Sequence, residues 1–260
     1  MTKEIIKNSK AYIAIIIVLL IYLIFTFIFF RKDKTEDTLK PYLVTDNSKY
    51  IYTEKNTLEK IEETNDYNWK DYNIYVDNEY IGNYKLQYNN KWYIYNNERD
   101  SIKYEGKIIA ASNMNIKVYD YEKKSITQEE QYKINNYLER NNIDLVEYDL
   151  ADSKVEIDLD NDNEIEKIYR INSKINNNPE NIFSIILLEK NNKIETIVSK
   201  VVPKNTNEKI ELFDIYGFLD IDNDEKKEIL INRMIYSQPE SSCEIVYKIK
   251  NKKYEKITEC

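Results

Sequence analysis

An uncharged, strongly apolar run lies near the N-terminus of the chain. Residues 11–30, AYIAIIIVLLIYLIFTFIFF, contain no charged residue, no proline and no glycine. A helix of this length spans about 30 Å, the thickness of a bilayer's hydrocarbon core. A cleaved signal peptide, the alternative, has a shorter apolar region that ends in small residues, whereas this run ends in Phe29 and Phe30 followed by Arg31. The pattern therefore predicts one uncleaved transmembrane helix.

Beyond this run the pattern changes to that of a polar segment followed by strands. Residues 31–64 are polar and mixed in charge, and we expect a juxtamembrane stalk that is partly helical over residues 56–63. From Tyr72 apolar and polar residues alternate with a period of two, and Asp77-Asn78 and Asn89-Asn90 supply turns. The alternation predicts a β-meander over residues 72–120.

One helix is expected within this β-rich region. Thr127-Gln-Glu-Glu130 is a capping box, in which the Thr hydroxyl and the Glu carboxylate satisfy backbone N–H groups reciprocally. Ile134, Tyr137 and Leu138 then fall on one helical face, and Asn141-Asn142 provides a stop. We expect this face to pack against a sheet rather than to bind a partner.

The C-terminal half of the chain repeats itself. The first unit begins VEIDLDNDNEIEKIYRI and the second GFLDIDNDEKKEILINRMI. The acidic runs that begin at Asp158 and Asp220 lie 62 residues apart, and the hairpin turns at Asn191 and Asn251 lie 60 apart. Each unit is expected to form four strands, the size of one propeller blade or a small sheet module.

These patterns together predict a single transmembrane helix plus a mainly β ectodomain with one α-helix, in which a β-meander is followed by two propeller-blade-like repeats. The expected divisions are a cytoplasmic tail (1–10), the transmembrane helix (11–30), the stalk (31–64), the β-meander plus helix (65–150) and two β repeats with acidic loops (151–260). Because the apolar periodicity lies within it, a fragment from Asn65 onward is expected to fold without the anchor.

Each repeat carries acids at positions 1, 3, 5 and 9 of a turning loop. Short carboxylates at alternate positions can point inward, and hard oxygen ligands in a flexible loop suit Ca²⁺ better than Mg²⁺ or a transition metal. An EF-hand is excluded because its twelfth position would be Tyr169 or Ile231. The alternative is that both runs are ordinary solvated turns. The acids are Asp158, Asp160, Asp162 and Glu166 in the first loop, and Asp220, Asp222, Asp224 and Glu228 in the second.

The pattern D-x-D-N-D-x-x-x-E between apolar strands resembles the calcium loop D-x-D-G-D-G-x-x-D/E of FG-GAP and VCBS-type repeats, which occur in integrin-like propellers and bacterial surface proteins. The resemblance covers residues 155–168 and 217–231. It implies that the eight acids coordinate metal through their side chains. It also implies a further ligand at the seventh position, the backbone carbonyl of Glu164 or Lys226.

The two loops depart from the family pattern at its glycines. Asn161 and Asn223 stand at the first glycine, and Asn163 and Glu225 stand at the second. Because Asn adopts a positive φ more readily than Glu, the second loop is expected to be the weaker calcium site.

The two cysteines, Cys243 and Cys260, indicate in which cellular compartment the C-terminal domain lies. If Asn251-Lys252 turns the last hairpin, facing residues have numbers that sum to 503, as these two do. Directly opposite residues lie about 4.5–5.5 Å apart at Cα, within the range of a disulfide, although two free thiols are the alternative. A disulfide fits an oxidising compartment.

The orientation in the membrane is decided by these features, because the basic residues flanking the apolar run are nearly balanced. The cysteines and the calcium loops favour a plasma-membrane protein with its N-terminus inside and its C-terminal domain extracytosolic.

The amino-acid composition excludes several classes of function. The absence of His removes Ser-His-Asp and Cys-His catalysis and the commonest zinc ligand, and the net charge of −8 argues against nucleic acid as a partner. We expect that the protein is not an enzyme. We expect instead a membrane-anchored binding or structural module, with a cell-surface protein or a glycan as its partner. The alternatives are an accessory subunit or sensor of a membrane complex and, less favoured, a carboxylate-based glycosidase.

Overall fold

The computed structural model describes Tyr22 and residues 41–53, 57–61, 67–89, 91–96, 100–143, 148–173, 181–203, 208–250 and 253–258. Met1–Lys40 forms one unit and Pro41–Cys260 a second. The expected cytoplasmic tail and transmembrane helix lie outside the described residues, apart from Tyr22. Within the described part of the chain, no helix is long and apolar enough to cross a membrane.

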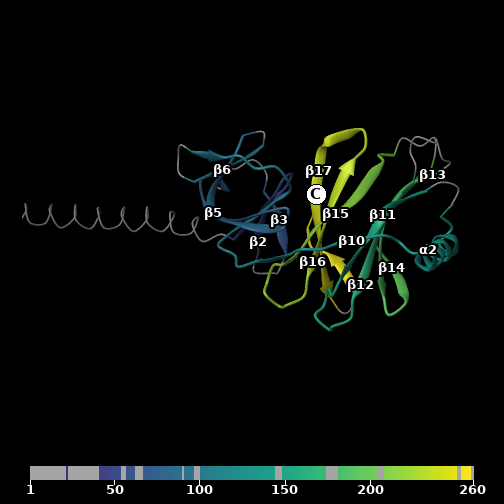
Figure 1. The fold of residues 1–260 in the computed structure, drawn as a ribbon. Coiled ribbons are helices and arrows are strands. Elements are labelled where there is room, and N and C mark those ends of the chain that lie inside the picture. The colour runs from purple at the N-terminus through teal and green to yellow at the C-terminus, as the bar shows by residue number, and fades with distance from the viewer. Residues whose placement is uncertain are drawn as a thin grey trace, which may run out of the picture. The chain divides into compact units, whose positions relative to one another are not determined.

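The unit from Pro41 onward is mainly β, as expected, with one helix among its described residues (Figure 1). Its first sheet has eight strands in the order β3-β2-β1-β8-β4-β5-β6-β7. Their bounds are β1 (Tyr42–Thr45), β2 (Lys49–Tyr52), β3 (Leu58–Lys60), β4 (Asp71–Val76), β5 (Glu79–Tyr88), β6 (Trp92–Tyr95), β7 (Ser101–Ile102) and β8 (Ile108–Ser112).

The expected β-meander holds for β4 to β7 but not beyond. These four strands pair consecutively, and Asp77 and Asn78 both take the positive φ of a two-residue hairpin turn. β8 then returns between β1 and β4, so it pairs on one side with a strand from the segment expected to be a stalk. Alternation alone identifies a strand but does not identify its neighbours.

The stalk and its short helix are corrected by the structure. Leu43 in β1 and Tyr50 in β2 are fully buried, and Leu58 opens a strand where a helix was expected. The Leu58 N–H donates to the Ile257 carbonyl at 3.1 Å, so this segment pairs with the distant C-terminal hairpin. Such long-range pairing overrides the local helical preference of the polar stretch around it.

The two repeats form two further sheets, and in each the four strands of the repeat pair consecutively and antiparallel. The second sheet has the order β10-β11-β12-β13-β14 and the third the order β18-β17-β16-β15-β9. The repeat strands are β11 (Tyr148–Ile157), β12 (Glu166–Ser173), β13 (Asn181–Lys190) and β14 (Lys193–Pro203), then β15 (Glu211–Asp220), β16 (Glu228–Ile235), β17 (Gln238–Lys250) and β18 (Lys253–Lys256).

One short segment contributes the fifth strand of both repeat sheets. β9 (Lys117–Tyr119) pairs with β15, and β10 (Lys123–Lys124) pairs with β11. Only three residues separate these strands, so the segment crosses from one repeat to the other. It therefore connects the two sheets at their first strands.

The layers follow one another in the order first sheet, third sheet, second sheet, helix (Figure 1). One core joins the two repeat sheets and includes Ile168 and Leu188 from the second and Phe218 from the third. Another joins the first and third sheets, with Leu43 against Leu219. Both repeat sheets thus bury two faces, which explains why β13 carries the unbroken apolar run Ile185-Ile186-Leu187-Leu188 instead of an alternating pattern.

The helix α2 (Gln128–Arg140) covers the outer face of the second sheet, as predicted. Thr127 is the N-cap, and both hydrogen bonds of the capping box with Glu130 are present. Ile134 and Leu138 are fully buried against Ile185 and other residues of the sheet. The apolar face of the helix is therefore used within the fold.

The last hairpin has the predicted register. Tyr247 pairs with Lys256 and Lys250 with Lys253, and both pairs sum to 503. Cys243 is buried and disulfide-bonded, while the chain's other cysteine, Cys260, lies outside the described residues. The Cys243–Cys260 pairing stays a prediction.

Candidate metal centre

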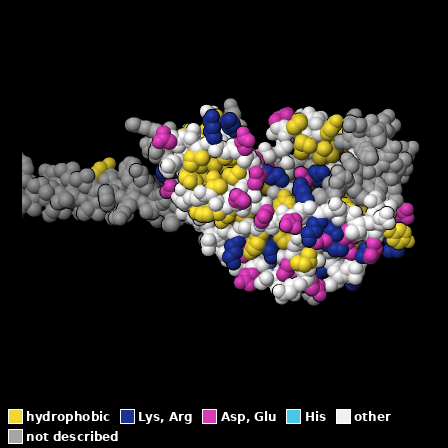
Figure 2. All heavy atoms as spheres, viewed as in Figure 1, with side chains coloured by type: hydrophobic (Ala, Val, Ile, Leu, Met, Phe, Trp, Pro, Cys, Tyr) yellow, Lys and Arg dark blue, Asp and Glu magenta, His cyan; other side chains and the backbone are white. Residues whose placement is uncertain are grey.

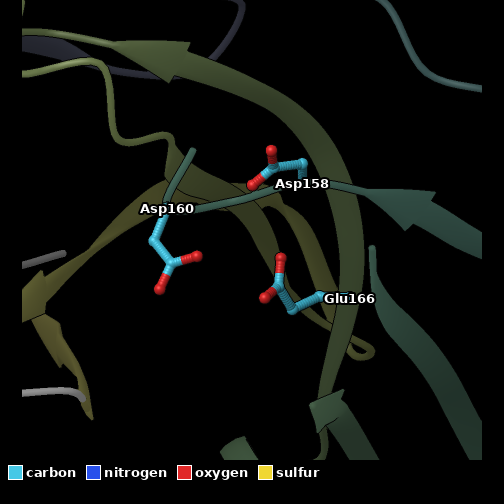
Figure 3. A group of neighbouring side chains, drawn as sticks. All are labelled: Asp158, Asp160 and Glu166. Carbon is cyan, nitrogen blue, oxygen red and sulfur yellow. The ribbon is translucent and has the colours of Figure 1, made fainter. Parts of the chain in front are cut away.

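The two acidic runs are the connections between the first and second strands of the repeats. The first loop joins β11 to β12 and the second joins β15 to β16. In each loop the acids at positions 1, 3 and 9 present one carboxylate oxygen apiece, and these oxygens lie within 4.8 Å of one another. Figure 3 shows Asp158, Asp160 and Glu166 of the first loop turned toward a common space. The equivalent group in the second loop is Asp220, Asp222 and Glu228.

The position-9 glutamate folds each loop by the same hydrogen bond. The Leu159 N–H donates to Glu166 Oε2 at 2.7 Å, and the Ile221 N–H donates to Glu228 Oε2 at 2.8 Å. These glutamates are 1% and 0% exposed, so each is a buried carboxylate held by the backbone of its own loop. Their second oxygens face a lysine: Glu166 Oε1 lies 2.6 Å from Lys190 Nζ, and Glu228 Oε1 lies 3.1 Å from Lys248 Nζ.

The position-1 aspartates organise the turn in a similar way. Asp158 Oδ2 accepts the Asn163 N–H at 3.1 Å. Asp220 accepts the N–H groups of Asp224 and Glu225, both at 3.1 Å. These bonds draw the backbone of each loop around its first carboxylate.

The backbone takes a left-handed conformation at the two positions where the resembled family has glycine. φ is 60° at Asn161 and 66° at Asn163 in the first loop, and 57° at Asn223 and 67° at Glu225 in the second. A positive φ is ordinary for Asn and unfavourable for Glu. The second loop therefore carries more backbone strain than the first.

The remaining predicted ligands lie at the rim of the loops. Asp162 and Asp224 are exposed and stand outside the groups of converging oxygens, although each accepts a backbone N–H from position 7. Glu164 and Lys226, which supply those N–H groups, are exposed as well. Their carbonyl oxygens stay predicted ligands.

A lysine that the sequence reading missed enters each loop from the third strand of the repeat. Lys190 Nζ lies 2.8 Å from Asp160 Oδ2, 2.7 Å from Asp162 Oδ2 and 2.6 Å from Glu166 Oε1. Burial works against the charge on this amine, but these carboxylates outweigh it and raise the pKa of Lys190.

The second loop has the same arrangement. Lys248 Nζ lies 2.5 Å from Asp222 Oδ2, 3.3 Å from Asp224 Oδ2 and 3.1 Å from Glu228 Oε1. In both loops the ammonium contacts the acids at positions 3, 5 and 9. The common space therefore already attracts a cation.

One ammonium does not satisfy either loop. Four acids and one lysine leave a formal charge of −3 in each, counted over the four loop positions. Asp158 Oδ1 and Asp222 Oδ1 are buried and accept no hydrogen bond from the described residues. A buried carboxylate oxygen without a donor is costly, and a divalent cation would satisfy it. The donor set, all oxygen and rich in carboxylates, fits Ca²⁺.

Electrostatics distinguishes the second loop. Burial raises the pKa of Glu228 to about 7, and the proximity of Asp222 adds to the rise, while the Ile221 N–H and Lys248 oppose it. A cation in this loop would favour the ionised form and lower that pKa.

The two loops lie side by side. The Lys227 N–H donates to the Leu159 carbonyl at 2.7 Å, and Lys227 Nζ donates to the Asp158 carbonyl. Asn161 Nδ2 donates to Glu225 Oε2 at 3.1 Å. The two loops are therefore hydrogen-bonded to each other through both backbone and side chains.

Buried acids elsewhere in the described residues have structural partners. Glu130 pairs with Lys154 and Lys167, Glu189 accepts from Tyr169 Oη at 2.5 Å, and Glu244 accepts from Thr45 Oγ1 at 2.7 Å. Carboxylates committed in this way do not favour the glycosidase alternative.

No family model, curated protein or solved structure matches this chain.

Proposed function

We propose that this chain is a membrane-anchored, extracytosolic binding or structural module whose two acidic loops bind Ca²⁺. One observation carries the proposal. In both repeats, acids at the same three loop positions converge within 4.8 Å, in loops with left-handed backbone where the resembled calcium loops have glycine. Ordinary solvated turns have no need to bring like charges together twice in the same geometry.

The role proposed for the metal is structural. When bound, Ca²⁺ would neutralise the carboxylates and accept their oxygens as ligands. Asp158 directly follows β11 and Glu166 begins β12, while Asp220 ends β15 and Glu228 begins β16. Ligation at these residues would therefore fix the first two strands of each repeat to each other at one end. The hydrogen bonds of Lys227 to the first loop then hold the two sheets in register.

The extracytosolic placement is supported by the same chemistry. Modules of this kind bind calcium at about 10⁻⁴–10⁻³ M, a concentration that exists outside cells and not in the cytosol. The disulfide-bonded Cys243 and the apolar run at residues 11–30 agree with an exported, anchored domain. Its partner would be a cell-surface protein or a glycan.

Thermal unfolding of the full chain in mild detergent tests the proposal. Binding to the native state alone stabilises it by about 1.4 kcal/mol per site when free calcium is ten times Kd. We expect the Tm to rise with millimolar Ca²⁺ relative to EDTA, and much less with Mg²⁺, whose strict octahedral demand suits these loops poorly. A Tm that is the same in EDTA, Ca²⁺ and Mg²⁺ contradicts the proposal.

A further inference from the structure

We propose that Lys190 and Lys248 are tethered cations that hold the acidic loops closed without metal and compete with Ca²⁺ for the same carboxylates. They would thereby set the calcium concentration at which each loop loads. The inference rests on the proposed calcium function, and it concerns two residues that the resemblance to calcium-loop repeats does not include.

The two lysines occupy equivalent places in the fold. Lys167 pairs with Glu189, so Glu166 and Lys190 stand one position further along the same antiparallel ladder. Ile229 pairs with Tyr247, which places Glu228 and Lys248 in the same relation. Each lysine thus projects from the strand beside the loop, opposite its position-9 glutamate. Recurrence in both repeats argues against a chance surface contact.

The contacts of the ammonium groups are those of a loop ligand. Each Nζ lies within 3.3 Å of carboxylates at positions 3, 5 and 9. Calcium binds oxygen at about 2.3–2.6 Å, so it would need the space that the ammonium holds. The two cations cannot share that space, and loading requires the lysine to move out.

A solvent-accessible pocket lies beside Lys190, into which its side chain could move. The pocket is lined by Asp160, Asp162 and Lys190 together with residues of the β13–β14 hairpin, so the ammonium and an incoming ion both have access to solvent there. The Lys190 side chain is 30% exposed, whereas that of Lys248 is 10% exposed. The first loop should therefore exchange its lysine for calcium more readily than the second.

Incomplete neutralisation favours the exchange. With the lysine in place, each loop retains a formal charge of −3 and a buried aspartate oxygen without a donor. A divalent ion supplies more positive charge and can ligate that oxygen. The lysine is thus sufficient to keep the loop folded at low calcium and weak enough to be displaced.

The test compares Lys190→Met and Lys248→Met with wild type in the full chain, using calorimetric titration with Ca²⁺ and thermal unfolding in EDTA. Methionine keeps the apolar stem and removes the charge. Lys209→Met and Lys253→Met are the controls, since both lysines are exposed and neither lines the pocket beside Lys190. Each test variant should bind calcium about tenfold more tightly at one of the two sites and melt lower in EDTA, with calcium restoring the loss. The controls should do neither.

The titrations distinguish failure of the tethered-cation proposal from failure of the proposed calcium function. If wild type binds two calcium ions and the test variants bind with unchanged Kd, the tethered-cation proposal is wrong and the calcium function stands. If neither wild type nor any variant binds calcium, the proposed function is wrong and the competition fails with it.

Discussion

At the scale of single residues, the left-handed positions of the loops separate the two sites. Asn163 and Glu225 occupy the same loop position with φ of 66° and 67°, yet only Asn accepts this conformation readily. Glu225→Asn should therefore raise the free energy of unfolding in EDTA by about 0.5–1 kcal/mol, and Asn163→Glu should lower it by a similar amount. Denaturant unfolding measures both changes.

Charge must be controlled in this exchange, because Glu225 adds to the acidity of its loop. Glu225→Gln removes the charge but keeps a side chain that disfavours positive φ. If Glu225→Gln stabilises as much as Glu225→Asn does, the backbone explanation is wrong and repulsion between carboxylates is the cause.

Glu130 provides a pH-dependent contribution outside the loops. Burial acts to raise its pKa, but Lys154, Lys167 and the N-cap outweigh burial and lower the pKa from 4.5 to about 2. A carboxyl with a depressed native pKa stabilises above its unfolded pKa, and the contribution is lost as the pH falls through the native value. It amounts to about 3 kcal/mol above pH 5.

Glu130→Gln should remove this contribution. The difference in unfolding free energy between wild type and variant is expected to be largest near pH 7 and to shrink from about pH 5 toward pH 2. Glu129→Gln, at the neighbouring and exposed position, should show little difference at any pH. Urea unfolding over this pH range provides the measurement, and a pH-independent difference for Glu130→Gln is the contrary result.

At the scale of elements, the signals that the sequence carries locally were reliable. The capping box at Thr127 and the 503 register of the last hairpin each depend on residues close in sequence, and the structure contains both. The convergence of Asp158, Asp160 and Glu166 follows from alternate spacing within one loop. Local geometry is sufficient for all of these features.

Features that depend on distant pairing could not be read from the sequence. Lys190 and Lys248 are 58 residues apart, whereas the hairpin turns lie 60 apart, so aligning the repeats by their turns does not match the two lysines. Only the ladder register shows that both face a position-9 glutamate. The same reason explains why β1 was missed: its partners β2 and β8 include a strand more than 60 residues away.

The segment β9–β10, which crosses between the two repeat sheets, makes a contribution to the free energy of unfolding that can be measured. Tyr121 lies between β9 and β10, and its ring meets Phe218 edge-on with a centroid distance of 5.1 Å. Tyr121→Ala should cost about 2–3 kcal/mol, because it removes a partly buried ring from the core shared by the repeats. Chemical denaturation gives the value. Tyr132→Ala, on the exposed side of α2, should cost far less, and equal losses would mean that the segment contributes nothing special.

At the scale of the whole molecule, the boundary of the folded unit moves toward the N-terminus. The fragment expected to begin at Asn65 lacks β1, which lies between β2 and β8 and buries Tyr42, Leu43 and Val44 completely. Loss of a central strand exposes two cores and unpairs β8.

A fragment of residues 41–260 should therefore fold cooperatively, and one of residues 65–260 should not. Dispersed NMR spectra and a single thermal transition are expected only for the longer fragment. A well-dispersed spectrum from the shorter one contradicts the assignment of β1 to the core.

Lys227 joins the two loops by hydrogen bonds, and we propose that each loop holds one calcium ion. If both loops bind calcium and these hydrogen bonds couple them, occupancy of one site would change the affinity of the other by the same factor in both directions. When a metal-ligating side chain of one loop is removed, the number of bound calcium ions must therefore be measured, because a change in stability alone does not show which site was lost.

Isothermal titration of the full chain with Ca²⁺, in wild type and in Asp160→Ala and Asp222→Ala, counts those ions most directly. We expect two ions for wild type and one for each variant, with the greater loss of affinity from Asp160→Ala because its loop has the less strained backbone. Asp120→Ala, outside both loops, should still bind two. Titration of wild type without heat, or a stoichiometry that Asp160→Ala and Asp222→Ala leave unchanged, would show that these loops are ordinary turns.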